Sequence, residues 1–421
     1  MNKLQPFLEH PDEIWPTLQA YWAAQQTKKL PKQPDLAFCY GTLPKVSRSF
    51  AIVIQQLPEG LRDAFCVFYL VLRALDTVED DMSIPIDKKV PLLHAFHNLS
   101  QQRGWTTKAG VAEYADLMAG YPAVIQVYLQ LDQQYCKVID DVCRRMGAGM
   151  ADFITDDVIT VDDYDLYCHY VAGLVGVGSS QLFAASGLES EQYAAADELS
   201  NHMGLFLQKT NIIRDYLEDI MEEPAPRMFW PREIWGKYVS SLDDLRHPQN
   251  EAAALHCLNH MICDALRHAP HSLEYMVGLR NYQIFRFCAI PQVMAIATLA
   301  LCYNNPAVFR GKVKMRRGQT AKYMMETDSM QTLLEAFMDF GTMLCKKAKS
   351  HRIAMAKDPT RETVVERLGV LQQRAAELQA LDEGVKAPVN TGQVSWAARA
   401  PLFVAVIMIL VALRSFWMSV L

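Results

Sequence analysis

Residues 61–81 read LRDAFCVFYLVLRALDTVEDD, an apolar run that ends in a cluster of acidic residues. Pro58 lies shortly before this stretch and Pro85 shortly after it, as expected at the two ends of a helix. A second long helix is predicted over residues 199–221, stopping before Pro224. No convincing alternation typical of strands occurs up to about residue 345, so the sequence predicts an all-α fold.

The acidic end of the first stretch occurs twice, as DTVED at 76–80 and DYLED at 215–219. Positions i, i+3 and i+4 share one face of a helix, so each DxxED motif brings together carboxylates that repel one another. A bound cation would remove this repulsion, and ligands that are all oxygens suit Mg²⁺. A single cluster would more simply be a solvated helix end, but the repetition favours a metal site. The predicted ligands are Asp76, Glu79, Asp80, Asp215, Glu218 and Asp219.

Polar side chains continue each acidic motif along its helix face. Tyr69 and Arg73 precede the first motif, and Gln208 and Asn211 precede the second, at helical spacing. Arg73 lies in an otherwise apolar stretch, where an unpaired guanidinium would be costly to bury, so it is expected to have an anion nearby. The pattern predicts a cavity inside a helical bundle, lined by acids, amides and arginines.

The composition excludes several classes of protein. Hydrophobic residues make up 51% of the 421 residues, which favours a large globular core over disorder. A net charge of −6 offers no general basic surface, so no nucleic-acid partner is expected. The ten cysteines form no CxxC pair, and the N-terminus has no secretory signal pattern, which indicates reduced thiols on the cytosolic side.

The C-terminus has the composition of a membrane anchor. Residues 401–413 carry no charge, and residues 401–421 are close to the ~20 residues that a spanning helix needs. Arg414 lies toward one end, where its guanidinium can reach the headgroups. The alternative is a buried terminal helix.

A second amphipathic segment precedes this anchor. Asp358 and Pro359 resemble the start of a helix whose apolar stripe is Val364, Leu368, Leu371, Ala375 and Leu378. The expected domains are therefore a catalytic domain at 1–345, an amphipathic helix and linker at 346–399, and a C-terminal membrane anchor at 400–421.

Two other patterns predict no site. His256 and His260 lack the glutamate of HExxH between them and are read as ordinary histidines. GLVGVG at 173–178 is not in the order of a dinucleotide-binding loop, and these glycines are expected to permit close helix packing.

The chain resembles the squalene/phytoene synthase family, and its squalene synthases in particular, over about residues 35–345. The motifs that carry the resemblance are VSRSFA at 46–51, YLVLRALDTVEDD at 69–81, YCHYVAGLVG at 167–176, FLQKTNIIRDYLED at 206–219, FWPREIW at 229–235 and FCAIPQVMAIATLALCYNN at 287–305.

This resemblance implies an isoprenoid synthase helical bundle with a central cavity. It also implies head-to-head condensation of two farnesyl diphosphates to presqualene diphosphate, followed by NADPH-dependent conversion to squalene, the first committed step of sterol biosynthesis. Asp76, Asp80, Asp215 and Asp219 would hold Mg²⁺ ions bridging the two diphosphates. Placement in the endoplasmic reticulum membrane, with the catalytic domain facing the cytosol, is expected from the anchor together with the resemblance.

The resemblance also assigns roles to residues. Expected catalytic residues are Tyr167, which is tied to proton removal in the first condensation, and Tyr69, Arg73, Phe50 and Phe287. Diphosphate binding is expected from Ser47, Arg48, Ser49, Arg73, Gln208, Asn211, Arg214 and Arg227. The basic stretch KVKMRRG at 312–318 matches a flap, in which Lys314, Arg316 and Arg317 would contact a diphosphate or NADPH. Without the resemblance, this stretch would be read as a solvated loop.

Three alternatives remain open from the sequence. A phytoene synthase-like enzyme would use longer substrates and no NADPH. A variant could stop at presqualene diphosphate. A third possibility is a membrane-bound isoprenoid-binding protein without catalysis.

Overall fold

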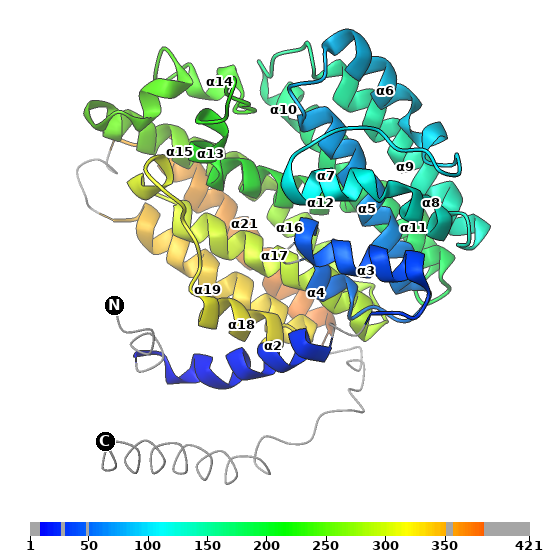
Figure 1. Ribbon diagram of the computed structural model, residues 1–421. Helices are drawn as coiled ribbons and strands as arrows, with labels where there is room; N and C mark the ends of the chain where they lie inside the picture. Colours follow the sequence, from blue (N-terminus) through cyan, green and yellow to red (C-terminus); the bar gives the residue numbers. More distant parts are fainter. Residues whose placement is uncertain (1–8, 27–29, 48–49, 351–356, 383–421) are drawn as a thin grey trace, which may run out of the picture. The chain divides into compact units, whose positions relative to one another are not determined.

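The computed structural model describes residues 9–26, 30–47, 50–350 and 357–382, and this part of the chain contains helices and no β-strand (Figure 1). These residues fall within one compact unit, Met1–Val385. The longer α-helices are α2 (Ile14–Gln26), α3 (Pro34–Ser47), α5 (Leu61–Asp80), α6 (Ile86–Leu99), α9 (Gln133–Asp152), α11 (Leu174–Ala185), α12 (Asp197–Arg214), α15 (Glu251–Ala265), α17 (Tyr282–Cys302), α19 (Met330–Ala348) and α21 (Arg361–Asp382).

Shorter helices connect these elements. They are α4 (Phe50–Ile54), α7 (Ala112–Ala119), α8 (Tyr121–Tyr128), α10 (Val161–Cys168), α13 (Tyr216–Ile220), α14 (Arg232–Trp235), α16 (Ala269–Val277) and α18 (Arg317–Glu326). One π-helical turn, η2 (His169–Gly173), joins α10 to α11. Single 3₁₀ turns are η1 (Pro11–Glu13), η3 (Glu191–Ala195), η4 (Leu242–Arg246), η5 (Pro248–Asn250), η6 (Leu266–His268) and η7 (Pro306–Phe309).

Helix α5 is the first of the two long helices predicted from the sequence, and the prediction is confirmed. It begins after Gly60, whose φ of +84° suits glycine, and it ends at Asp80 before the Pro85 turn. Most of its side chains are buried, because α3, α6, α8, α9 and α11 pack around it. The acidic end of α5 therefore emerges from the interior of the bundle.

The second predicted helix is interrupted. Helix α12 ends at Arg214 and α13 begins at Tyr216. The prediction of one continuous helix over 199–221 is therefore wrong at Asp215. Asp215 adopts φ −91° and ψ 9°, and its backbone carbonyl accepts the first hydrogen bonds of α13, from Glu218 at 2.8 Å and Asp219 at 3.1 Å. Glu218 and Asp219, the last two acids of the second motif, therefore lie on α13 and not on a continuation of α12.

Glycines let α12 approach η2 and α11 closely, as the sequence predicts for GLVGVG. A Cβ at Gly176 would lie 2.2 Å from the carbonyl oxygen of Ser200. On the opposite helix, a Cβ at Gly204 would lie 2.2 Å from the carbonyl oxygen of Ala172. This close contact sets α10 and α12 side by side, and both carry residues of the site.

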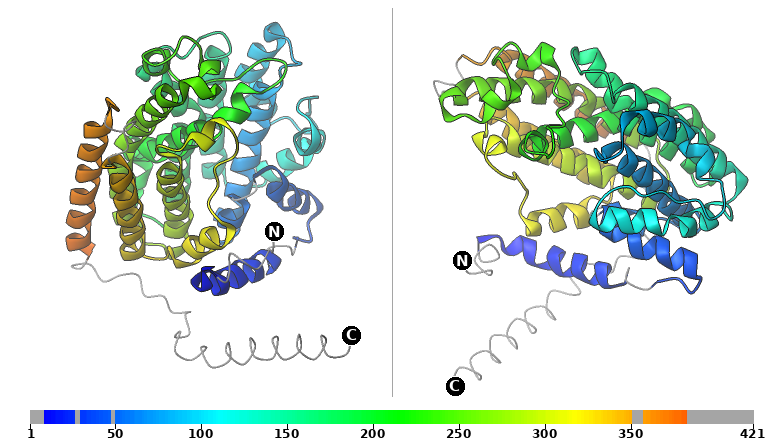
Figure 2. Two further views of the ribbon diagram at one scale, coloured as in Figure 1. Left: turned by 90° about the vertical axis from the view of Figure 1, so that its left-hand side faces the viewer. Right: turned by 45° about the horizontal axis from the view of Figure 1, so that its top comes forward.

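Two further helices test expectations about the C-terminal half. The predicted stripe Val364, Leu368, Leu371, Ala375 and Leu378 is buried on α21, which packs against α16 and α19 (Figure 2). Helix α17 is long and apolar enough to cross a membrane, with a mean hydropathy of 1.8, but 67% of that window is buried, as in a core helix. The predicted anchor at 400–421 lies outside the described residues.

Candidate active site

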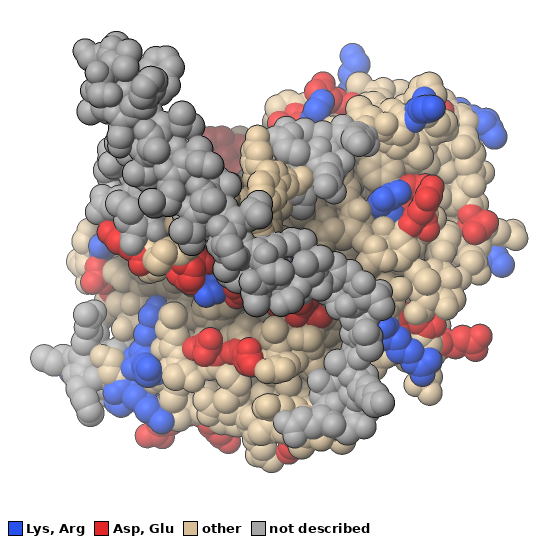
Figure 3. Space-filling view, turned by 90° about the horizontal axis from the view of Figure 1, so that it is seen from below, with Lys and Arg blue, Asp and Glu red and all other residues tan. Residues whose placement is uncertain are grey.

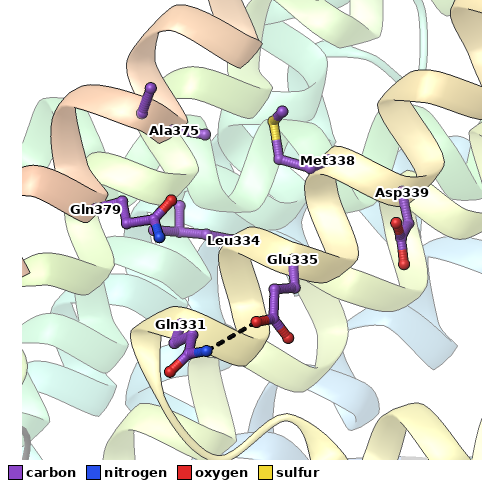
Figure 4. A pocket seen from close by; sticks show the side chains of 8 residues that line it. Gln331, Leu334, Glu335, Met338, Asp339, Ala375 and Gln379 are labelled. Carbon is purple, nitrogen blue, oxygen red and sulfur yellow. Dashed lines mark hydrogen bonds between the residues drawn. The ribbon is translucent and has the colours of Figure 1, made fainter.

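Both acidic motifs contribute to one cavity of about 240 Å³. Asp80 reaches it from α5, Tyr167 from α10, and Gln208 and Asn211 from α12, as the cavity predicted from the sequence requires. The remaining lining residues are Ile212, Asp215, Asp219, Glu222, Arg227 and Phe229. A larger cavity of about 370 Å³ lies between α19 and α21 and contains no residue of either motif (Figure 4).

Arginines hold the carboxylates of the first motif. Nη1 of Arg73 lies 2.6 Å from Asp76, which confirms that Arg73 has an anion nearby. Arg227 donates from Nη2 to Glu79 at 2.6 Å and from Nη1 to Asp80. The Glu79 side chain is buried and does not line the cavity. Its partner in the structure is Arg227.

Cations also hold the second motif. Arg214 donates from Nε to Asp215 at 2.8 Å, and Lys312 forms an ion pair with Glu218. Lys312 begins the basic flap, so the flap reaches the second motif through a residue that the sequence analysis did not select. Like Glu79, Glu218 is absent from the cavity lining.

Burial raises the pKa of three acids in or beside the cavity. Burial raises the pKa of Asp219 to about 7, with further contributions from the negative charges of Asp215 and Glu222. Burial also raises the pKa of Asp76 to about 6 and that of Glu79 to about 8, although neighbouring arginines oppose both shifts. A bound cation stabilises carboxylates that lie close together, and oxygen ligands suit a hard divalent metal.

No three acidic, histidine or cysteine side chains are grouped to hold a metal in the described part of the chain. Arg73, Arg214, Arg227 and Lys312 pair with carboxylates of both motifs. Metal binding would therefore require these cations to exchange carboxylate partners for other anions.

Tyr167 stands in an aromatic setting at the wall of the cavity. Its ring stacks on Phe229, with centroids 4.0 Å apart and an interplanar angle of 8°, and Phe153 packs edge-on at 5.4 Å. Burial raises the pKa of the Tyr167 phenol well above its ordinary value, and the negative charge of Glu79 adds to the shift. Tyr167 is therefore a neutral phenol at physiological pH.

A backbone irregularity follows Tyr167. The π-helical turn η2 begins two residues later, at His169. Such turns occur often at functional sites because they change the direction in which side chains point.

Tyr69 and Phe50 form a second group on the other side of Arg73. Nη2 of Arg73 donates to the Tyr69 hydroxyl at 3.2 Å, and the Phe50 and Tyr69 rings are 6.1 Å apart. The Nε of Arg73 is buried and has no hydrogen-bond partner among the described residues. A buried donor without a partner is costly, and an anion placed there would satisfy it.

Phe287 lies in an aromatic cluster, packing on Phe65 at 4.8 Å and on Phe183 at 5.9 Å.

Ser47 donates its hydroxyl to the Leu43 carbonyl at 2.6 Å, so that proton is engaged within α3. Arg48 and Ser49 lie outside the described residues.

The three predicted cofactor-binding residues are exposed and do not line the cavity. Lys314 and Arg317 lie on either side of Arg316 on the flap. Nη2 of Arg316 donates to Glu13 at 2.5 Å, which ties the flap to the N-terminal segment. This contact could not be predicted from helical periodicity, because the two residues are 303 positions apart.

A buried charge network supports α12 from behind. The Lys209 ammonium is fully buried and pairs with Asp165 of α10 and, at 2.5 Å, with Asp264 of α15. Arg267 bonds the same two acids at 2.7 and 2.8 Å. Because Lys209 follows Gln208 directly, the network fixes the register of the helix that lines the cavity.

Sequence reasoning missed Phe229, Glu222 and Lys312. Phe229 and Glu222 flank Arg227 in the segment between α13 and α14. Their positions depend on how this irregular segment folds back over the acidic motifs, which helical periodicity does not report.

Comparison with known proteins places the chain in a family. Residues 43–319 match the model of the squalene/phytoene synthase family. Squalene synthase LSS of Botryococcus braunii is 57% identical over 372 residues, covering 88% of this chain and 80% of that protein. Lycopaoctaene synthase of the same organism is 52% identical over 391 residues, covering 92% and 87%. The solved complex of TcSQS with the ligand E5700 is 47% identical, covers 82% of this chain and 99% of that one, and superposes with a TM-score of 0.79.

Proposed function

This chain belongs to the squalene/phytoene synthase family, and we propose that the cavity between α5, α10 and α12 is where it joins two farnesyl diphosphate molecules head to head. It is an enzyme, and its product is squalene. The observation that carries the location is the convergence of Asp80, Asp215 and Asp219 on one cavity that also contains Tyr167.

We propose that the acidic residues bind Mg²⁺, with Asp80, Asp215 and Asp219 as direct ligands and Asp76 beside them. When bound, the metal withdraws charge from the leaving diphosphate. Glu79 and Glu218 act by holding Arg227 and Lys312, their partners in the structure.

The arginines are the substrate's counterions in this proposal. Arg73, Arg214 and Arg227 now pair with carboxylates, and each would turn its guanidinium to diphosphate oxygens when substrate enters. The partnerless Nε of Arg73 supports this exchange, because it already lacks an acceptor. Ser47, Arg48, Ser49, Gln208 and Asn211 would supply further donors.

Tyr167 acts on the carbocation that diphosphate departure leaves. Its ring face, ordered by Phe229, stabilises positive charge by about 0.5–2 kcal/mol. Since burial keeps the phenol neutral, Oη does not act as a phenolate base. It accepts the proton from the very acidic carbocation while passing its own proton to a diphosphate oxygen. Tyr69 and Phe50 line the approach beside Arg73, and Phe287 shapes the apolar region of the second step.

The second half-reaction uses NADPH, which supplies a hydride when bound. Lys314, Arg316 and Arg317 are proposed to bind its phosphates. Arg316 fits this role, because its contact with Glu13 uses Nη2 and a guanidinium has five donors in all.

The chain is further proposed to be anchored in the endoplasmic reticulum membrane by residues 400–421, with the catalytic domain in the cytosol. The uncharged run at 401–413 supports this. The helix and linker at 346–399 would connect the domain to the anchor.

A direct test is to supply purified chain with Mg²⁺, NADPH and either farnesyl or geranylgeranyl diphosphate, and to identify the hydrocarbons by mass spectrometry. Squalene from farnesyl diphosphate, at a much higher kcat/KM than any product of the longer substrate, is expected. The similarity to lycopaoctaene synthase makes this comparison necessary. Preference for geranylgeranyl diphosphate would contradict the assignment of substrate.

A further inference from the structure

Helix α2 presents three large apolar side chains to solvent, where an ordinary surface helix presents polar ones. Leu18, Tyr21 and Trp22 are 37%, 59% and 51% exposed. They occupy positions i, i+3 and i+4 and therefore share one face. The Trp15 ring continues this aromatic face, packing edge-on against Trp22 at 5.6 Å.

The opposite side of this segment faces the protein. The Glu13 side chain is buried against α18, where its carboxylate receives Arg316 at 2.5 Å. Asp12 pairs with Lys322 of α18 at 2.6 Å, and Pro16 is also buried. Ion pairs therefore hold the segment on α18 with its aromatic face outward.

The composition around this face suits a lipid surface. Residues 14–26 contain no charged side chain, and Lys28, Lys29 and Lys32 follow directly in the sequence. Tryptophan and tyrosine favour the boundary between headgroups and acyl chains, and neighbouring lysines favour anionic headgroups. Figure 3 looks onto the side of the molecule where α2 lies and shows both charged and uncharged areas on it.

We propose that α2 lies in the plane of a lipid bilayer, with Leu18, Tyr21 and Trp22 inserted at the headgroup boundary. This inference rests on the proposed function in one respect, that the substrate tails and the product are apolar and partition into lipid. It would also orient the domain, because a linker such as 383–399 can extend about 60 Å at ~3.5 Å per residue and would not by itself fix the domain. A second attachment through α2 would hold one face of the domain against the membrane.

The test uses the full-length chain bound to vesicles of phosphatidylcholine with an anionic lipid, with and without bromine on the acyl chains. Brominated lipid quenches tryptophan only at close range. Subtracting the emission of Trp22→Phe from that of the wild type isolates the Trp22 signal. Trp230→Phe is the matched control, because Trp230 is 1% exposed in the core.

We expect bromine to reduce the Trp22 signal at least two-fold and to leave the Trp230 signal unchanged. Equal quenching of the two signals, or failure of the chain to bind vesicles, would overturn the proposal. A concentration-dependent dimer in detergent that Trp22→Glu abolishes would show that a second copy covers this face, and would also overturn it. Squalene formation in detergent should be the same for Trp22→Phe and wild type, so failure of the membrane contact is distinguishable from failure of the proposed reaction.

Discussion

At the scale of single residues, the site is held together by charge pairs that substrate would have to rearrange. Four cations engage the carboxylates of the two acidic motifs in the described structure. Binding of metal and diphosphate together keeps the charges balanced. The metal replaces the arginines as the partner of the carboxylates, and the diphosphate replaces the carboxylates as the partner of the arginines. Binding of metal or diphosphate alone would leave groups unpaired, which predicts cooperative binding of the two.

Asp219→Asn should lower turnover by orders of magnitude and leave thermal stability equal or slightly raised. In the wild type, burial and the negative charges of Asp215 and Glu222 disfavour the charged Asp219 carboxylate. Removing this charge relieves the repulsion in the metal-free protein. Steady-state kinetics over a range of Mg²⁺ concentrations and thermal melts measure the two effects. Asp81→Asn is the matched control, because Asp81 bonds Ser83 and the Gly110 amide outside the cavity and should retain activity.

Wild-type rates in Asp219→Asn would refute the metal assignment. Loss of both folding and activity would instead give Asp219 a structural role.

A histidine pair behind the site predicts a pH dependence of stability. Nδ1 of His202 and Nδ1 of His268 are 2.7 Å apart, and the His271 ring stacks on His202 at 4.1 Å. Burial lowers the pKa of His202 to about 4, with a further contribution from His271 and opposition from Glu198. The unfolded state therefore binds more protons between about pH 6.5 and 4, so the free energy of unfolding should fall as pH falls through this window.

Urea unfolding of the wild type and His202→Gln at pH 7 and pH 5 measures this effect. We expect the loss of stability between the two pH values to be smaller in the variant. An equal loss in both proteins would mean that His202 titrates normally in the folded state.

At the scale of helices, the sequence predicted most of what positions the site. Repetition of DxxED and the shared faces of Tyr69, Arg73, Gln208 and Asn211 follow from helical spacing alone, and the structure brings Asp80, Gln208 and Asn211 to one cavity. The break at Asp215 was not predicted, since nothing in DYLED differs locally from a continuing helix. Contacts such as the ion pair of Lys312 with Glu218 depend on how distant segments pack together. Helical periodicity reports only local spacing and does not predict them.

The flap between η7 and α18 should serve only the second half-reaction. Replacing both Lys314 and Arg316 with Ala should leave presqualene diphosphate formation largely intact and slow squalene formation at least ten-fold. Arg310→Ala is the control, because this nearby arginine pairs with Glu251 on the surface. Product ratios with limiting NADPH give the measurement.

Normal squalene formation in the double variant would make Lys314 and Arg316 ordinary surface residues. Equal loss of both products would move them to the site of the first diphosphate.

At the scale of the whole molecule, the all-α fold was predictable because its helices are long and strongly apolar. The extent of the folded unit was harder to predict. Helix α21 was expected as an amphipathic helix after the catalytic domain, and it packs on α16 and α19 within the unit that ends at Val385. The apolar stripe of Val364, Leu368 and Leu371 predicts that one face of this helix is buried. It does not predict which helices cover that face.

Removing residues from about Ser395 onward should yield an enzyme that no longer spans a membrane and keeps its chemistry, because no catalytic motif lies there. Carbonate extraction of membranes and assays of the extract measure both properties. In intact microsomes, added protease should digest the catalytic domain of the full chain. Protection of that domain would reverse the proposed topology, and loss of turnover in a folded truncation would place catalytic residues in the tail.

The most direct test of the central claim is to withhold NADPH while supplying farnesyl diphosphate and Mg²⁺. The account predicts that the wild type accumulates presqualene diphosphate, because the first condensation needs no hydride, and that adding NADPH then releases squalene. Tyr167→Phe should make neither product, since proton loss precedes the intermediate. Failure to form presqualene diphosphate without NADPH, or its formation at the normal rate by Tyr167→Phe, would contradict the account.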